Sequence, residues 1–144
     1  MIIKGNWKGQ YKYNLKAHPD IKGLEATNFE IEILSIVNEY FTGSVQDDLK
    51  TGGTEGIGEI TGTITGNKIE FTKQMPVKTV LFNKRLGRKT FNKKHPPIYY
   101  SGTFSEGGKT VSGTWKFKFG FLWIGIFPIP MPPTSGTWTM SLIE

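Results

Sequence analysis

One lysine, Lys73, occupies a position where its side chain is expected to point into a protein interior. It follows Ile69 and Phe71 at intervals of two residues, and Met75 continues the series. Alternate residues of a strand share a face, so a strand over 69–75 turns Lys73 inward. A buried ammonium needs a partner or water. Asp47 has the inward position in its own segment and is able to pair with it.

Two interpretations of Lys73 follow from this pattern. In the first, its ammonium binds the carboxylate of a ligand, and Tyr11, Tyr13 and Tyr100 form hydrogen-bonding walls around it. In the second, the strand ends earlier, and Lys73 lies past the rim of the sheet with its ammonium in solvent. The second interpretation is the commoner outcome for a lysine near a strand end.

The residues required for catalysis or metal binding do not form a recognisable set. The chain has no cysteine, and its two histidines, His18 and His95, each lie beside a proline without metal-binding spacing. Asp47 and Asp48 are adjacent and point to opposite faces of a strand, so they cannot act as a pair. The sequence therefore predicts no catalytic residue, no metal site and no cofactor, and it favours a protein that is not an enzyme.

Positive charge is concentrated in the second half of the chain. Residues 1–70 carry 7 basic and 10 acidic side chains, whereas residues 71–144 carry 11 basic and 2 acidic ones. Phe82 and Phe91 alternate with the cations of the basic segment 76–95. Such a segment suits nucleic-acid phosphates and bases or an anionic membrane, and it is also typical of a solvated hairpin or loop. The solvated hairpin or loop is the preferred interpretation, and nucleic acid is not the expected partner.

Residues 119–133 form an uncharged, strongly apolar loop. The loop is too short and too rich in proline to span a bilayer as a helix. Three interpretations remain open: a lid over the interior, a surface for homodimer formation, or a tip that dips into a membrane surface. The lid and the dimer are the simpler pair, because an exposed apolar patch is normally covered.

Eight segments show the alternation of apolar and polar residues that is typical of strands. They cover residues 5–13, 28–37, 41–47, 58–64, 69–75, 98–104, 111–119 and 136–142. In the second segment, the alternation predicts inward positions for Ser35 and Val37. Turn signals at 38–39, 66–67 and 106–108 join neighbouring segments as hairpins. Residues 14–27 are expected to form a capping loop with a short helical turn.

Inward glycines recur beside large rings, such as Gly113 beside Trp115 and Gly136 beside Trp138. Small closed barrels need this alternation, because their strands coil tightly and bulky rings cross the interior. Closure also removes exposed sheet edges. The sequence therefore predicts that residues 1–144 form one all-β domain, a single eight-stranded antiparallel up-and-down barrel with little helix.

The start of the first segment, Gly5-x-Trp7, resembles the G-x-W signature of lipocalins and other calycins, and the eight-strand meander agrees with it along the whole chain. The resemblance implies a lipocalin-like barrel in which Trp7 plugs the closed end and the open end admits a small apolar ligand. The arginine that lipocalins place near the end of the last strand is missing from residues 138–144, as is a C-terminal helix. The chain is thus most similar to a compact calycin-like barrel.

Taken together, these patterns favour a binding module for a small apolar or aromatic molecule. The expected ligand-binding residues are Tyr11, Tyr13, Phe71, Lys73, Tyr100, Trp115 and Trp138. The alternative is an interaction or structural protein that uses the apolar loop 119–133 and the basic segment 76–95 for contacts. The first seven residues lack a basic segment followed by an apolar run, which predicts a cytoplasmic location.

Overall fold

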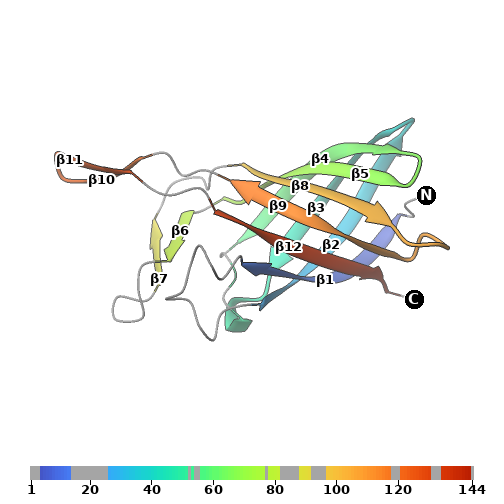
Figure 1. The fold of residues 1–144 in the computed structure, drawn as a ribbon, viewed down its shortest axis with the longest axis horizontal. Coiled ribbons are helices and arrows are strands. Elements are labelled where there is room, and N and C mark those ends of the chain that lie inside the picture. Colours follow the sequence, from blue (N-terminus) through green and yellow to red (C-terminus); the bar gives the residue numbers. More distant parts are fainter. Residues whose placement is uncertain are drawn as a thin grey trace.

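The computed structural model confirms an all-β chain built on a closed, eight-stranded antiparallel barrel (Figure 1). It describes residues 4–13, 26–51, 53, 56–76, 78–81, 88–91, 97–117, 121–130 and 134–143. The barrel strands are β1 (Gly5–Tyr13), β2 (Ala26–Val37), β3 (Tyr40–Asp47), β4 (Ile57–Thr65), β5 (Lys68–Gln74), β8 (Ile98–Phe104), β9 (Thr110–Phe117) and β12 (Thr134–Leu142). Each pairs with the next barrel strand along the chain, and β12 pairs with β1 to close the circle.

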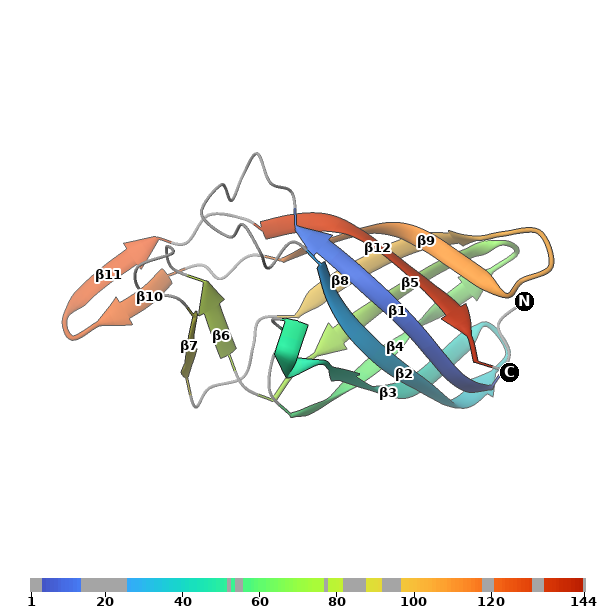
Figure 2. The same cartoon turned by 90° about the horizontal axis from the view of Figure 1, so that it is seen from below.

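The two ends of the barrel differ in the length of their connections. Tight reversals at Asn38, Gly66 and Gly107, each with a positive φ, lie at the end that also holds both termini (Figures 1 and 2). The longer connections leave the opposite end, which we call the loop end. Most of the expected capping loop, residues 14–25, lies outside the described residues.

The expected inward positions in the second strand are wrong after Ile33. A β-bulge there places Leu34 as an extra residue, so Ser35 pairs with Thr42 and Ile36 pairs with Phe41. A bulge shifts the alternation by one residue. Ile36 therefore packs against the core, whereas Val37 is 63% exposed.

Indole rings lie flat on the inner surface of the barrel where glycines leave room for them. A Cβ on Gly102 would come 2.7 Å from Cζ2 of Trp138, and one on Gly136 would come 2.7 Å from Cζ2 of Trp115. The indole N–H of Trp115 donates to the carbonyl of Thr137 at 3.0 Å. That of Trp138 donates to two backbone carbonyls, so neither buried ring leaves its polar group unsatisfied.

Trp7 lies in the core near the start of β1. Its side chain is fully buried, and its ring meets that of Phe104 edge-on with centroids 6.4 Å apart. The expected placement of this tryptophan inside the first strand is confirmed. Its pairing with Leu142 places it at the end of the barrel where β1 begins and β12 ends.

Two further hairpins extend from the loop end. A hairpin was one of the two structures expected for the basic segment, whereas none was expected over 119–133. β6 (Lys78–Leu81) pairs with β7 (Arg88–Phe91) within the basic segment. β10 (Phe121–Ile124) pairs with β11 (Phe127–Pro130), so the prediction of a loop over 119–133 is wrong for these residues. Gly125 supplies the positive φ, 62°, that a two-residue reversal needs. Both views show β10 and β11 extending away from the barrel instead of lying across it.

Adding a methyl group beneath Trp138 is expected to destabilise the barrel. Gly102→Ala forces the indole or the strand to shift, and overpacking of this kind costs about 1–3 kcal/mol. Urea unfolding, followed by tryptophan fluorescence, measures the free energy of unfolding. Ser101→Ala, at the adjacent exposed position of β8, is the matched control and should change it by less than about 0.5 kcal/mol. Equal stability of the two variants would contradict the packing described here.

Candidate ligand-binding site

A buried ion pair lies inside the barrel toward the loop end. Lys73, near the end of β5, and Asp47, at the end of β3, approach to 2.6 Å between Nζ and Oδ1. Their side chains are 2% and 1% exposed. The pairing expected from the inward positions is confirmed, and the interpretation of Lys73 as a solvated lysine past the rim is wrong. The strand continues far enough to keep its side chain inside.

Aromatic side chains surround the two charges. The hydroxyl of Tyr11 donates to Oδ2 of Asp47 at 3.1 Å. The Lys73 ammonium lies 4.9 Å from the ring centroid of Tyr11 and 5.9 Å from those of Phe29 and Tyr100. Ring faces attract a cation at these distances, and the attraction is strongest where water is excluded. The carboxylate and the three rings together hold the ammonium in an otherwise apolar interior.

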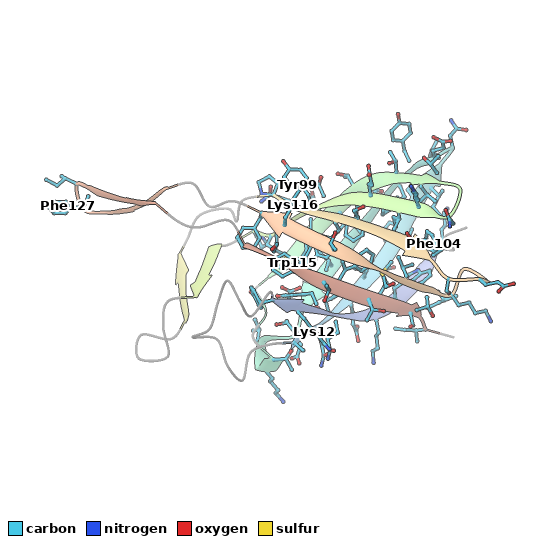
Figure 3. The ribbon with its side chains drawn as sticks, in the orientation of Figure 1. Lys12, Tyr99, Phe104, Trp115, Lys116 and Phe127 are labelled. Atoms are coloured by element: carbon cyan, nitrogen blue, oxygen red, sulfur yellow. The ribbon has the colours of Figure 1, made fainter. Side chains whose placement is uncertain are left out.

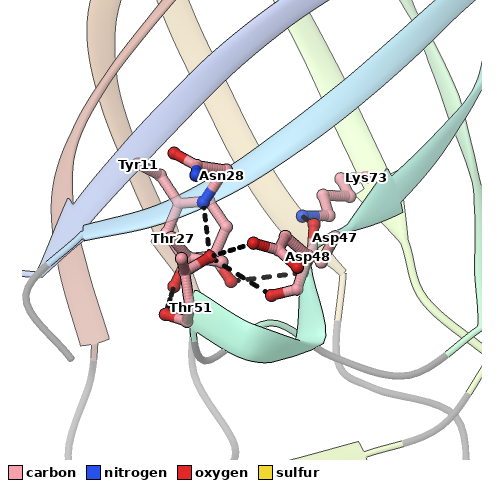
Figure 4. Close-up of polar contacts among 7 residues, drawn as sticks. All are labelled: Tyr11, Thr27, Asn28, Asp47, Asp48, Thr51 and Lys73. Atoms are coloured by element: carbon pink, nitrogen blue, oxygen red, sulfur yellow. Dashed lines mark hydrogen bonds and ion pairs between the residues drawn. The ribbon is translucent and has the colours of Figure 1, made fainter.

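The turn after β3 covers the ion pair (Figure 4). Asp48 immediately precedes a short 3-10 helix (Leu49–Thr51), and its carboxylate accepts hydrogen bonds from the hydroxyl of Thr51 and the backbone N–H of Lys50. Thr51 accepts a hydrogen bond from the N–H of Asn28 in β2, at 2.9 Å. The backbone of Gly53 packs so closely on Asp47 that a Cβ there would overlap the Asp47 side chain. This packing excludes solvent from the carboxylate.

The seven predicted ligand-binding residues all contribute to one interior. The Phe71 and Tyr100 rings stack 4.7 Å apart, and both meet Trp138 edge-on at 5.4 Å. Tyr13 meets Trp115 edge-on at 5.2 Å and Tyr11 at 6.0 Å. Tyr13 is half-buried, whereas the other six are buried. Lys73 lies between the two aromatic groups, because its ammonium faces both the Tyr11 and the Tyr100 rings.

The two buried tyrosines hold their protons more tightly than exposed ones. Burial raises the pKa of Tyr11 well above its ordinary value, and the nearby Tyr13 and Asp47 raise it further. Burial likewise raises the pKa of Tyr100, with a smaller contribution from Asp47. A phenolate in this site would face both an apolar medium and a carboxylate. Both hydroxyls therefore remain neutral hydrogen-bonding groups at neutral pH.

Among the described residues, no group of three histidine, aspartate or glutamate side chains could hold a metal ion. His18 and His95 lie outside that part of the chain. The described ranges also hold no helix with the length and apolar character needed to span a membrane.

A groove of about 1160 Å³ is lined by residues of β1, β4, β5, β8, β9 and β12. Hydroxyl-bearing residues dominate its wall, together with exposed Tyr99 and Lys116, which Figure 3 shows near the loop end of the barrel. Four of the predicted ligand-binding residues, Tyr13, Phe71, Tyr100 and Trp115, also line this groove.

Sequence reasoning missed two parts of the site. Phe29 was not predicted to belong to the site, although its ring lies 5.9 Å from the Lys73 ammonium. The cover formed by residues 48–51 and 53 was not predicted, because the alternation of apolar and polar residues ends at Asp47. The one available signal was Asp48 three residues before Thr51, which is the spacing of a helix-start cap.

Comparison of the chain with protein-family models, with characterised proteins and with solved structures finds no match to any of them.

Raising the pH above about 10 is expected to weaken the fold through Tyr100. Below that pH the tyrosine is protonated in both the folded and the unfolded chain, so its contribution to stability is complete. At higher pH the unfolded chain releases the proton while the folded one keeps it, and stability falls by about 1.4 kcal/mol per pH unit. Urea unfolding between pH 8 and 11.5 should show a shallower decline for Tyr100→Phe than for the wild type. Tyr99→Phe, the exposed neighbour on β8, should decline as the wild type does, and identical slopes for all three would contradict the raised pKa.

Breaking the ion pair from one side is expected to destabilise more than removing both charges. Lys73→Met leaves a buried carboxylate without its cation, a change that costs about 3–5 kcal/mol. Asp47→Asn together with Lys73→Met removes both charges and keeps an oxygen to accept from Tyr11, so it should recover most of that loss. Unfolding free energies of the two single variants and the double variant measure the coupling. Lys68→Met, an exposed position on the same strand, is the control for loss of a lysine.

Proposed function

We propose that this chain is a lipocalin-like barrel that binds a small apolar or aromatic molecule carrying a hydrogen-bond acceptor, such as a carboxylate. The single observation that carries the proposal is the buried ammonium of Lys73. It has three N–H donors, and within the described residues it has one hydrogen-bond acceptor, Asp47. An acceptor atom of a ligand would satisfy a second donor.

The surroundings of the ammonium favour a ligand with an apolar or aromatic body. The stacked pair Phe71 and Tyr100 and the edge-on pair Tyr13 and Trp115 present flat, polarisable surfaces. Ligand sites are typically apolar and aromatic cavities with a few polar groups that fix the orientation. Lys73 and the neutral hydroxyls of Tyr11 and Tyr100 are the polar groups of this interior.

The energetics of the ion pair also support a binding role. A buried ion pair is usually no more stabilising than apolar residues of the same volume. The Lys73 and Asp47 pair in a core of aromatic rings is therefore not explained by its contribution to the stability of the fold. Strongly shifted titratable groups inside a pocket are candidates for function, and Tyr11 and Tyr100 both contact this pair or its cation.

The loop end is the proposed route for the ligand. β1, β3, β5 and β9 end there, and Tyr13 is the half-buried ring of the aromatic group at that end. The opposite end is filled by Trp7 and Phe104. In a lipocalin-like barrel the first-strand tryptophan closes one end and the ligand enters at the other. This agrees with the difference between the two ends of this barrel.

The test is a panel of fatty acids and aromatic carboxylates, each compared with its methyl ester. Ligand present at about 100 times its Kd stabilises the folded chain by about 2.7 kcal/mol, which raises the Tm by several degrees. The acid should raise the Tm more than its ester, because only the acid supplies a charged acceptor for Lys73.

The double variant Asp47→Asn with Lys73→Met should respond equally to acid and ester, while Lys68→Met should keep the wild-type preference. Isothermal titration calorimetry measures the Kd of the acid and the Kd of the ester for each variant. No response to any acid or ester in the panel would overturn the proposal.

A further inference from the structure

The β10 and β11 hairpin is an apolar projection at the loop end. Residues 119–133 carry no charged side chain. Figures 1 and 2 show the hairpin extending beyond the barrel along its long axis, and Figure 3 places Phe127 at its far end. Ile126 and Phe127, at and beside the reversal, are 81% and 68% exposed. Two large apolar side chains at the tip of a projection are better placed to enter an apolar medium than to pack on the barrel.

The positions of two prolines reduce the free energy required to transfer this hairpin from water into lipid. In the observed register, Ile124 pairs with Phe127 next to the two-residue reversal. The N–H groups of alternate positions, 121, 123, 128 and 130, then point away from the partner strand. Pro128 and Pro130 occupy two of these four positions and have no N–H. An unpaired N–H is costly in lipid, and the outer edge of β11 lacks these two donors.

A second hairpin at the same end carries positive charge. β6 and β7 include Lys78, Arg88 and Lys89, and both views place this hairpin between the barrel and the β10 and β11 hairpin. No acidic residue occurs in the sequence between Glu70 and Glu106. Cations behind an apolar tip match the arrangement of an anionic membrane, in which charged headgroups lie outside the hydrocarbon.

We propose that the β10 and β11 hairpin inserts its tip into an anionic lipid surface while the β6 and β7 hairpin contacts the headgroups. A four-residue strand is about 13 Å long, whereas the hydrocarbon core is about 30 Å thick. The hairpin therefore enters one leaflet and does not cross the bilayer. Basic residues near an anionic surface add electrostatic attraction to the apolar contribution.

The same features argue against two other binding partners for these hairpins, a second copy of the chain and a nucleic acid. Strand addition by a second copy at the outer edge of β11 needs donors there, and β11 lacks N–H groups at 128 and 130. A nucleic acid would use the cations but would leave the apolar tip in water. Lipid is the partner that uses both hairpins.

Vesicle flotation with the full chain tests the proposal. Vesicles of phosphatidylcholine alone are compared with vesicles that contain one third phosphatidylglycerol, in low salt. The wild type should partition onto the anionic vesicles at least tenfold more strongly than onto the neutral ones. Raising the salt concentration should reduce the difference between the two, because salt screens the headgroup attraction.

Matched variants separate the two contributions. Ile126→Ser with Phe127→Ser should lower partitioning about tenfold or more, whereas Val37→Ser with Tyr40→Ser should not change it. Val37 and Tyr40 are 63% and 68% exposed at the opposite end of the barrel. Arg88→Gln should lower binding to anionic vesicles roughly fivefold, and Lys68→Gln should leave it unchanged. Near-ultraviolet circular dichroism confirms that each variant is folded.

Three results would overturn the proposal. The first is equal partitioning of the wild type and the tip variant, and the second is no retention on either vesicle. The third is a concentration-dependent dimer, seen by light scattering, that the tip variant abolishes while vesicle binding stays absent. That last result would assign the hairpin to self-association.

Discussion

The pairing of β1 with β12 is the constraint on which the rest of this structure depends. Seven residues of the first strand pair with seven of the last, from Trp7 opposite Leu142 to Tyr13 opposite Gly136. This contact joins the two ends of the chain and converts an open sheet into a tube without edges. Once the tube is closed, every inward side chain must fit a fixed volume. Glycine beneath an indole is the solution at Gly102 and Gly136.

The closed tube also explains why its charges are held so tightly. A cation and an anion on an open sheet could reach water, but Lys73 and Asp47 are sealed inside by strands and by the backbone of Gly53. Each charge lies beside its opposite, and Tyr11 supplies a further donor to the carboxylate. Removing water strengthens these contacts and makes an unpaired partner costly. The same conditions make the ammonium a strong anchor for an acceptor placed beside it.

The two ends of the barrel differ in structure. Short reversals and Trp7 complete one end, which leaves no long segment there to vary. The other end carries the long connections, the ion pair beneath them, and two hairpins of contrasting character. Loops on a rigid scaffold commonly carry function. Our two proposals use this one end, with the interior for a small ligand and the outer hairpins for lipid.

The sequence by itself determined the barrel, because period-two alternation and turn residues are local signals that eight segments repeat. It also predicted inward positions for Lys73 and Asp47, although the preferred interpretation placed the Lys73 ammonium in solvent. Only the tertiary structure decided that they meet, since 26 residues separate them along the chain and a lysine near a strand end has solvent as an alternative. The bulge after Ile33 was equally invisible, because an apolar Leu34 fits either face until the pairing with β3 fixes the register. The apolar run at 119–133 has no polar alternation, so its hairpin register came from backbone pairing and a glycine reversal.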